Sequence, residues 1–366
     1  MKKLLAIVLT AAMLLAMLCA CAAKPTETAA TDTKATIGIL MPTKEQTIWS
    51  IQGERLTEAF QKAGYATQIE YAEDDSAKQA MQIENMITKG VNVLVIAAVD
   101  CAALTDACEK AKDAGIYVIA DDRLITNTKA VDFYVTFDLV RMGELQGQYI
   151  VDKLDLENQA GPFTLEIFSG SQDDTNAISF YQGAMNKLQP YLDNGKLVVK
   201  SGQSSYTETA IQSWDSSKAQ SRMDNLLSGY YADSHLDAVL VAADCLALGV
   251  ISSLESMGYG TDANPYPIVT GQDAELAAVK NILAGKQSMT AFLDANKLTE
   301  ILVPVVDDLV GRRGVDARDD VALAVDERGQ ARVALGDDLE HEVLRLGSLA
   351  PVVLVGHEGH GSALRP

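Results

Sequence analysis

From Thr36 onward, short apolar runs alternate with stretches whose apolar residues recur at helical spacing. The runs Ile37 to Leu40, Thr67 to Tyr71 and 91–100 have the length and residue types of strands. Each helical stretch between them ends at a glycine: Gly64, Gly90 and Gly115. Successive strands joined through helices lie parallel, so this part of the chain is predicted to form a doubly wound α/β sheet.

A second alternating series begins after Asp138. Its expected strands are Phe163 to Phe168, Leu197 to Val199, Ala238 to Ala242 and Pro267 to Thr270. Its expected helices include Asn176 to Leu188 and Leu246 to Met257. The segments VLVIAAVDCAAL (93–104) and AVLVAADCLALG (238–249) echo each other, each running a buried strand into an Asp and a small-residue helix. Two similar lobes are therefore predicted.

The expected strand in IYVIADDRLI (116–125) ends in three charged residues: Asp121, Asp122 and Arg123. Open α/β sheets bind ligands at the carboxyl ends of their strands. A carboxylate beside a guanidinium offers acceptors and planar donors to a polyhydroxyl ligand. A solvated loop or a structural ion pair explains the same stretch equally well.

Asp100 and Asp244 take similar places in the two lobes, after a strand and before a helix. Helix N-capping explains each of them alone, and we favour capping for Asp100.

The composition indicates a globular chain of about two domains, with 366 residues, 48% hydrophobic and 22% charged. The formal net charge of -20 and the pI near 4.5 argue against nucleic acid as a partner.

The amino terminus has the pattern of a secretory leader. Lys2 and Lys3 precede the apolar run Leu4 to Leu18, which is shorter than a transmembrane span of about 20 residues. The sequence LCAC that ends at Cys21 resembles a bacterial lipoprotein box. We therefore expect a signal peptide over 1–20, a lipidated Cys21 and a flexible tether over 21–35. An ordinary leader containing cysteines is the alternative.

Three cysteines remain after the leader: Cys101, Cys108 and Cys245. Cys101 and Cys108 on one helix would stand about 10 Å apart, too far for a disulfide. We interpret all three as small packed residues. The cysteine and histidine spacings complete no zinc site, and no metal or other cofactor is predicted.

Several motifs taken together resemble the xylose- and multiple-sugar-binding family of periplasmic substrate-binding proteins for ABC importers. They lie in order over about 36–316: IGILMPT, QIENMITKGVNVLVIA, DDRLI, TFD, QDDTNA, VVKSGQ, RMDNLL and IVTGQDAE. The resemblance implies a type I periplasmic binding protein with two lobes, a three-crossover hinge and an aldose clamped between the lobes. Closure around the sugar would create the surface that the permease subunits recognise.

The resemblance also implies which side chains contact the sugar. They are Lys44, Trp49, Asp122, Arg123, Asp138, Asn176, Trp214, Asn225, Asp244 and Gln272. Because of this resemblance, we interpret Asp244 as a sugar ligand and not as a helix cap. Carboxylates, amides and a guanidinium suit sugar hydroxyls, and a flat aromatic face suits the C–H surface of the ring.

Some positions depart from the family pattern and bear on sugar identity and affinity. Ile48 stands where the family has Arg, Asp121 where it has Tyr, and Leu139 where it has Asn. Where the family has the sequence FKDTR, this chain has FLDAN, so Leu293 stands in place of a lysine.

The resemblance assigns 36–138 plus 273–293 to the first lobe and 139–272 plus 294–316 to the second. Residues 317–366 are expected to form a divergent segment packed on the second lobe, with strands in VALAV, ARVAL and PVVLV and with Pro304 kinking or interrupting the preceding helix. Lysine gives way to arginine after Lys297, as an appended domain, recombination or a frame change would produce.

The predicted function is a monomeric, exported, lipid-anchored sugar-binding protein without catalytic activity. Its ligand would be an aldose of the xylose, glucose or galactose class. A receptor that presents sugar to a membrane sensor is one alternative. A glycoside-processing enzyme that uses Asp122 with Asp244 or Glu166 is another, because such enzymes need two carboxylates about 5 to 10 Å apart.

Overall fold

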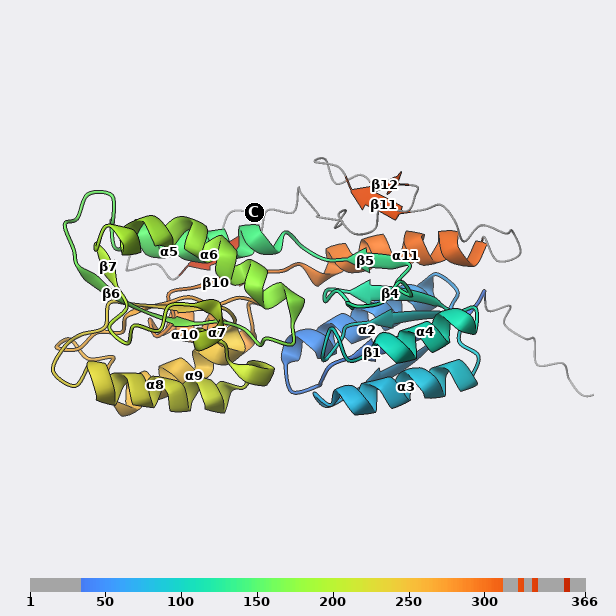
Figure 1. The fold of residues 1–366 in the computed structure, drawn as a ribbon, viewed down its shortest axis with the longest axis horizontal. Helices are drawn as coiled ribbons and strands as arrows, with labels where there is room; N and C mark the ends of the chain where they lie inside the picture. Colours follow the sequence, from blue (N-terminus) through green and yellow to red (C-terminus); the bar gives the residue numbers. More distant parts are fainter. Residues whose placement is uncertain (1–33, 312–321, 326–330, 335–351, 356–366) are drawn as a thin grey trace, which may run out of the picture. The chain divides into compact units, whose positions relative to one another are not determined.

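The computed structural model describes residues 34–311 and three later strands, which are β11 (Ala322–Val325), β12 (Ala331–Ala334) and β13 (Val352–Val355). The main body contains two parallel sheets with helices on both faces, as expected (Figure 1). The predicted signal peptide, Cys21 and nearly all of the predicted tether lie outside the described residues. None of the helices in the described ranges has the length and apolar character needed to cross a membrane.

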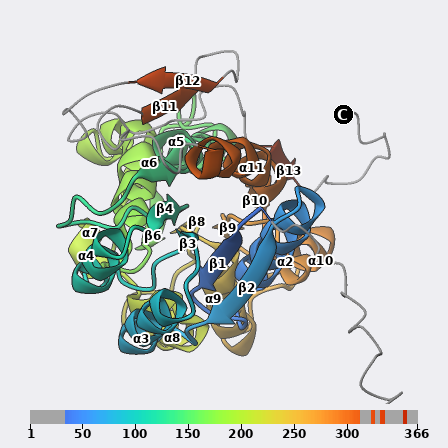
Figure 2. The same ribbon diagram turned by 90° about the vertical axis from the view of Figure 1, so that its right-hand side faces the viewer.

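The first lobe has a five-stranded sheet in the order β2-β1-β3-β4-β5, with every pair parallel. The strands are β1 (Thr36–Met41), β2 (Ala66–Tyr71), β3 (Val93–Ile96), β4 (Tyr117–Asp121) and β5 (Phe133–Val135). The helices before the crossover are α2 (Thr47–Lys62), α3 (Ser76–Thr88) and α4 (Thr105–Asp113). Helices α3 and α4 cover one face of the sheet (Figure 2). Alternate strand residues pack on each face, as two-sided burial of a parallel sheet requires.

The second lobe has a four-stranded sheet in the order β7-β6-β8-β9. Its strands are β6 (Phe163–Phe168), β7 (Leu197–Val198), β8 (Ala238–Val241) and β9 (Ile268–Val269). Its helices are α5 (Leu139–Lys153), α6 (Thr175–Asp193), α7 (Tyr206–Thr209), η2 (Gln212–Trp214), α8 (Ser216–Tyr230), α9 (Asp244–Ser256) and α10 (Leu276–Leu283). Helices α5 and α6 pack closely because Gly143 carries no side chain: a Cβ there would lie 1.9 Å from the Phe180 carbonyl oxygen.

The predicted lobe assignment is wrong for 273–293 and for 294–311, the described part of 294–316, because the contacts place them the other way round. Strand β10 (Met289–Phe292) joins the edge of the second sheet, where Ala291 N donates to Gly271 O at 3.0 Å. Helix α11 (Ala295–Gly311) packs on α2 of the first lobe, and Tyr65 Oη donates to Asp307 Oδ1 at 2.6 Å. The chain does cross between lobes next to Phe292, as expected.

Pro304 does not interrupt α11, which runs unbroken from Ala295 to Gly311. The three late apolar runs each supply a strand, as predicted. Strand β13 pairs antiparallel with β10 and so adds to the second lobe, while β11 and β12 pair with each other. The rest of the predicted segment 317–366 lies outside the described residues.

Candidate functional site

A pocket lies where the strand ends of the two lobes meet. It encloses about 420 Å³, a volume that includes the open space at its mouth. Six of the ten predicted sugar contacts line it: Trp49, Asp122, Arg123, Asn176, Trp214 and Gln272. The other lining residues are Gln46, Ile48, Asp174, Phe180, Ala243, Cys245, Asp273 and Leu293.

Arg123 is fixed in the pocket by an ion pair and a hydrogen bond. It follows β4 in a turn where Asp122 has φ 63° and the Asp122 amide donates to Val135 O at 2.8 Å. Its Nε lies 2.9 Å from Asp174 Oδ2, and its Nη1 donates to Ala98 O at 2.9 Å. Because Arg123 and Asp174 are both nearly fully buried, this ion pair is far less screened than a surface pair.

The amino end of α6 completes a polar network between the lobes. Asp174 caps the helix by accepting from the Asn176 amide at 2.8 Å. Asn176 Nδ2 then donates to Asp122 Oδ1 at 2.8 Å and to Asp122 O at 3.2 Å. Trp214 Nε1 donates to Asp174 Oδ2 at 3.2 Å. The stretch 116–125, for which a ligand site and a structural ion pair were both considered, thus contributes Arg123 to an ion pair with Asp174 in the pocket lining.

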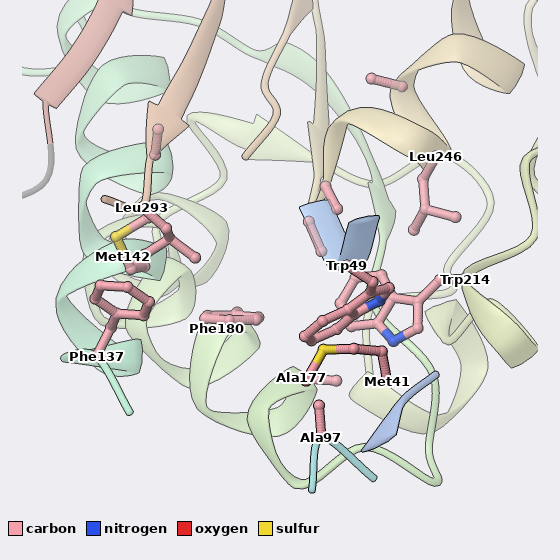
Figure 3. Close-up of a cluster of buried hydrophobic side chains, with 14 of the residues drawn as sticks. Met41, Trp49, Ala97, Phe137, Met142, Ala177, Phe180, Trp214, Leu246 and Leu293 are labelled. Atoms are coloured by element: carbon pink, nitrogen blue, oxygen red, sulfur yellow. The ribbon is translucent and has the colours of Figure 1, made fainter. Parts of the chain in front are cut away.

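The two tryptophans lie on the same side of Phe180 (Figure 3). Trp49 is 5% exposed, its Nε1 donates to Gln46 Oε1 at 3.1 Å, and the Arg123 guanidinium lies 4.9 Å from its ring centroid. Trp214 is 7% exposed despite its polar sequence context, and its backbone has φ 52°. Both rings therefore belong to the hydrophobic cluster and still line the pocket.

Two buried acceptors in the pocket have no protein partner among the described residues. They are Asn176 Oδ1 and Gln272 Oε1, on side chains that are 2% and 3% exposed. The Asn176 amide orientation is fixed because its nitrogen faces two Asp122 oxygens. Buried polar atoms are nearly always hydrogen-bonded in native proteins, so both oxygens suit hydroxyl donors of a ligand.

Three predicted contacts lie away from this pocket. Lys44 is exposed, with its Nζ 4.7 Å from the Tyr71 ring centroid. Asp138 caps α5 by accepting from the Arg141 amide at 3.0 Å. Asn225 is on the exposed face of α8. The structure does not bring these side chains to the site.

Asp244 is also absent from the pocket lining, and its bonds correct the ligand role that we predicted. It is fully buried at the start of α9, where Oδ1 accepts from Gln287 Nε2 at 2.8 Å. Its Oδ2 accepts from the Glu275 amide at 2.9 Å and from Thr290 Oγ1 at 2.8 Å. Asp244 thus joins the loop after β9 to β10. Asp100 accepts from two backbone amides of the turn before α4, so it caps that turn while Leu104 is the N-cap residue of the helix.

Sequence reasoning missed Asp174 and Asp273. Asp174 lies within the motif QDDTNA, and an acidic side chain directly before a helix is a capping signal. Asp273 follows Gln272 with φ 96°, and its amide donates to Ala291 O at 2.8 Å. Cys101 and Cys108 are buried free thiols, as expected, but Cys245 lines the pocket.

Two carboxyl groups of the pocket, Asp122 and Asp273, hold protons more tightly than usual. The pKa of Asp122 is raised to about 7, chiefly by burial and then by the charge of Asp174, while Arg123 and Asn176 oppose the shift. Burial, followed by the charges of Asp244 and Glu275, raises the pKa of Asp273 well above its ordinary value.

We expect the protein to be more stable at pH 5 than at pH 8. The pKa values of Asp121, Asp122 and Asp244 are each raised, chiefly by burial, to about 7. A raised folded-state pKa contributes stability that is complete below the unfolded pKa near 4 and is lost as pH rises through 7. The groups facing these carboxyls are Gln52, Arg123, Asp174, Asn176, Asp273, Glu275, Gln287 and Thr290.

The free energy of unfolding from urea titrations should be larger at pH 5 by at least about 1.4 kcal/mol, the equivalent of one pKa unit. Asp121→Asn keeps a side-chain oxygen for Gln52 and should reduce this difference. Equal or greater stability at pH 8 would rule out the proton linkage.

Comparison with known proteins identifies the family. The model for the periplasmic binding protein domain matches residues 37–313. The multiple sugar-binding periplasmic receptor ChvE of Rhizobium radiobacter is 51% identical over 277 residues, which is 76% of this chain and 78% of that protein. The D-xylose-binding periplasmic protein of Escherichia coli is 34% identical over 259 residues, covering 70% of this chain and 73% of that protein.

A solved structure agrees with these relatives. The ABC transporter solute-binding protein from Clostridium phytofermentans with bound β-D-glucose is 40% identical, with a TM-score of 0.75, covering 88% of this chain and 94% of that one. The fold, the domain match and the identity to the multiple sugar-binding and D-xylose-binding proteins lead to one conclusion: this chain belongs to the periplasmic binding protein family, in the group of its sugar-binding members.

Proposed function

We propose that this protein is the extracytoplasmic substrate-binding component of a sugar ABC importer, which binds an aldose of the xylose, glucose or galactose class and delivers it to the permease subunits. The observation that carries the proposal is the polar network across the pocket, where Arg123 meets Asp174 and Asp122 meets Asn176. Each pair joins one lobe to the other. A ligand held among these groups would contact both lobes at once.

The chemistry of the pocket suits a sugar ring. Asp122 and the free oxygens of Asn176 and Gln272 would accept hydrogen bonds from hydroxyl groups, and Arg123 would donate. Trp49 and Trp214 offer aromatic faces to the C–H surface of the ring. Contacts from both lobes would favour the closed arrangement, because a ligand shifts a conformational equilibrium through its differential affinity for the two states.

The arrangement of carboxylates argues against a glycoside-processing enzyme. Glu166 accepts from Tyr231 Oη at 2.8 Å and from Ser201 Oγ at 2.7 Å, and neither it nor Asp244 lines the pocket. Neither carboxylate proposed as a partner for Asp122 is therefore placed beside a sugar bound there. We propose a binding protein with no catalytic activity.

Titration of the protein with D-xylose, D-glucose and D-galactose tests this proposal, with the products assayed in the same samples. We expect saturable binding of at least one sugar, at one site per chain, with no change in the sugar. Conversion of a sugar would favour an enzyme, and failure of every aldose to bind would refute sugar recognition. One relative is named a receptor, so a sensing role is tested as well. Sugar uptake and sugar signalling should both be measured in a strain that lacks the permease genes.

We also propose that the protein acts as a monomer held at the outer face of the cell membrane by a lipid on Cys21. Cys21→Ser should release it into the medium or leave its leader uncut, because serine lacks the thiol that receives the lipid. Immunoblots of membrane and medium fractions measure the outcome, with Cys19→Ser as the matched control that should stay anchored. A Cys21→Ser protein that is processed and still found with membranes would refute the anchor.

A further inference from the structure

The pocket is lined by both apolar and hydrogen-bonding residues. We call five of the apolar residues the apolar wall: Ile48, Phe180, Ala243, Cys245 and Leu293. All five belong to or pack on a single hydrophobic cluster that also contains the two tryptophans. The hydrogen-bonding groups come from other lining residues, chiefly the charged and amide side chains of the network between the lobes.

The packing behind Leu293 is apolar as well. Figure 3 shows Leu293 beside Met142 and Phe137, with Phe180 between them and the tryptophans. The backbone carbonyl of Leu293 already accepts from the Ala295 amide at 3.0 Å. Cys245 differs, because carboxyl groups lie near it: burial, followed by the charges of Asp273, Glu275 and Asp244, raises the pKa of its thiol well above the ordinary value, so this side chain stays uncharged.

A sugar hydroxyl that faces Ile48 and Leu293 in this wall would lose its hydrogen bonds to water, and neither side chain could replace them. An unpaired buried hydroxyl is costly, whereas a methyl group in the same place loses nothing and buries apolar surface. The wall therefore discriminates between sugars by the group that meets it. An exocyclic carbon is the part of a pyranose where a hydroxymethyl, a methyl or a hydrogen can stand on the same ring.

We propose that the pocket prefers a 6-deoxyhexose over the hexose of the same configuration, with Ile48 and Leu293 as the residues that set this preference. The inference rests on the proposed sugar-binding function and narrows its substrate class. The corresponding pentose, which lacks the exocyclic carbon, avoids the unpaired hydroxyl but leaves the wall without a contact. It should bind with intermediate affinity.

Two sets of sugars with matched ring configurations test the preference by calorimetric titration. One set is D-glucose, 6-deoxy-D-glucose and D-xylose, and the other is D-galactose, D-fucose and L-arabinose. In the set that fits the ring, we expect the 6-deoxyhexose to bind at least about tenfold more tightly than the hexose. The affinity for the 6-deoxyhexose should exceed the affinity for the pentose by about threefold, as expected for one buried methyl group.

Leu293→Gln should bring the hexose and the 6-deoxyhexose within about threefold of each other, because the amide gives the hydroxyl a partner. Leu283→Gln makes the same change on α10, where Leu283 is 82% exposed, and should keep the full preference. Ile48→Gln, at a half-buried position, repeats the test should Leu293→Gln fold poorly.

A hexose that binds as tightly as its 6-deoxy partner in both sets would overturn the inference and leave the sugar-binding function standing. If none of the six sugars binds, the proposed function fails and the inference falls with it. A preference that survives both Leu293→Gln and Ile48→Gln would refute the role of the wall.

Discussion

Arg123→Ala should weaken sugar binding by at least about a hundredfold. The guanidinium lies 2.9 Å from Asp174, donates to Ala98 O and sits over the Trp49 ring, so its removal affects both lobes. Asp174 would be left buried and without its cation, which costs about 3 to 5 kcal/mol, or more than a hundredfold in affinity if the closed state bears it. Calorimetric titration with the best-bound sugar measures the change.

Arg141→Ala is the matched control. Arg141 pairs with Glu144 at 3.0 Å on the surface of α5, and its side chain is 51% exposed. An exposed pair contributes about 0 to 1 kcal/mol, so affinity should stay within about twofold of wild type. If Arg123→Ala binds as tightly as Arg141→Ala, the ion pair between the lobes has no part in sugar recognition.

Asp244→Ala should lower the free energy of unfolding by about 3 kcal/mol or more. The carboxylate accepts from Gln287, Thr290 and the Glu275 amide. The side chains of Gln287 and Thr290 are buried, so water cannot replace the carboxylate as their acceptor. Each lost hydrogen bond leaves a donor without an acceptor, and an unsatisfied buried donor destabilises the folded state by about 1 to 3 kcal/mol. Urea unfolding at pH 7 measures the loss.

Asp100→Ala is the control, because Asp100 occupies the corresponding place in the first lobe. It accepts only from the amides of Ala102 and Ala103 in a partly exposed turn, and loss of such a cap costs about 1 kcal/mol. An Asp244→Ala protein with unchanged stability and lost sugar affinity would restore the ligand role that the sequence predicted for Asp244.

The sequence predicts most of the fold because buried parallel strands leave a strong local signal. The run Phe163 to Phe168 is observed with the predicted bounds, and the other expected strands are shifted by a few residues at their ends. Strand β5 and strand β10 were not predicted: β5 has only three residues, and MTAF is too short to show a period. The lobe that receives α10, β10 or α11 depends on contacts distant in sequence, such as Tyr65 with Asp307. No local pattern records these contacts.

The site was predicted where side chains follow directly from a strand end or a helix start. Arg123 after β4 and Asn176 in the first turn of α6 both reach the pocket. The family resemblance was misleading for Asp244, because its hydrogen-bond donors come from three segments: Glu275 in the loop after β9, Gln287 between α10 and β10, and Thr290 in β10. Asn225 fails for a simpler reason, since the periodicity of α8 buries Leu226 and turns its neighbour to solvent.

A crystal structure of the protein grown with its best-bound sugar tests the central claim most directly. The account predicts one sugar ring in the pocket, with Trp49 and Trp214 against its C–H surface and with Arg123, Asn176 and Gln272 within hydrogen-bond distance of its hydroxyls. Asp244 should keep its bonds to Gln287 and Thr290 and should not touch the sugar. A sugar bound outside this pocket, or one held only by residues of a single lobe, would contradict the account.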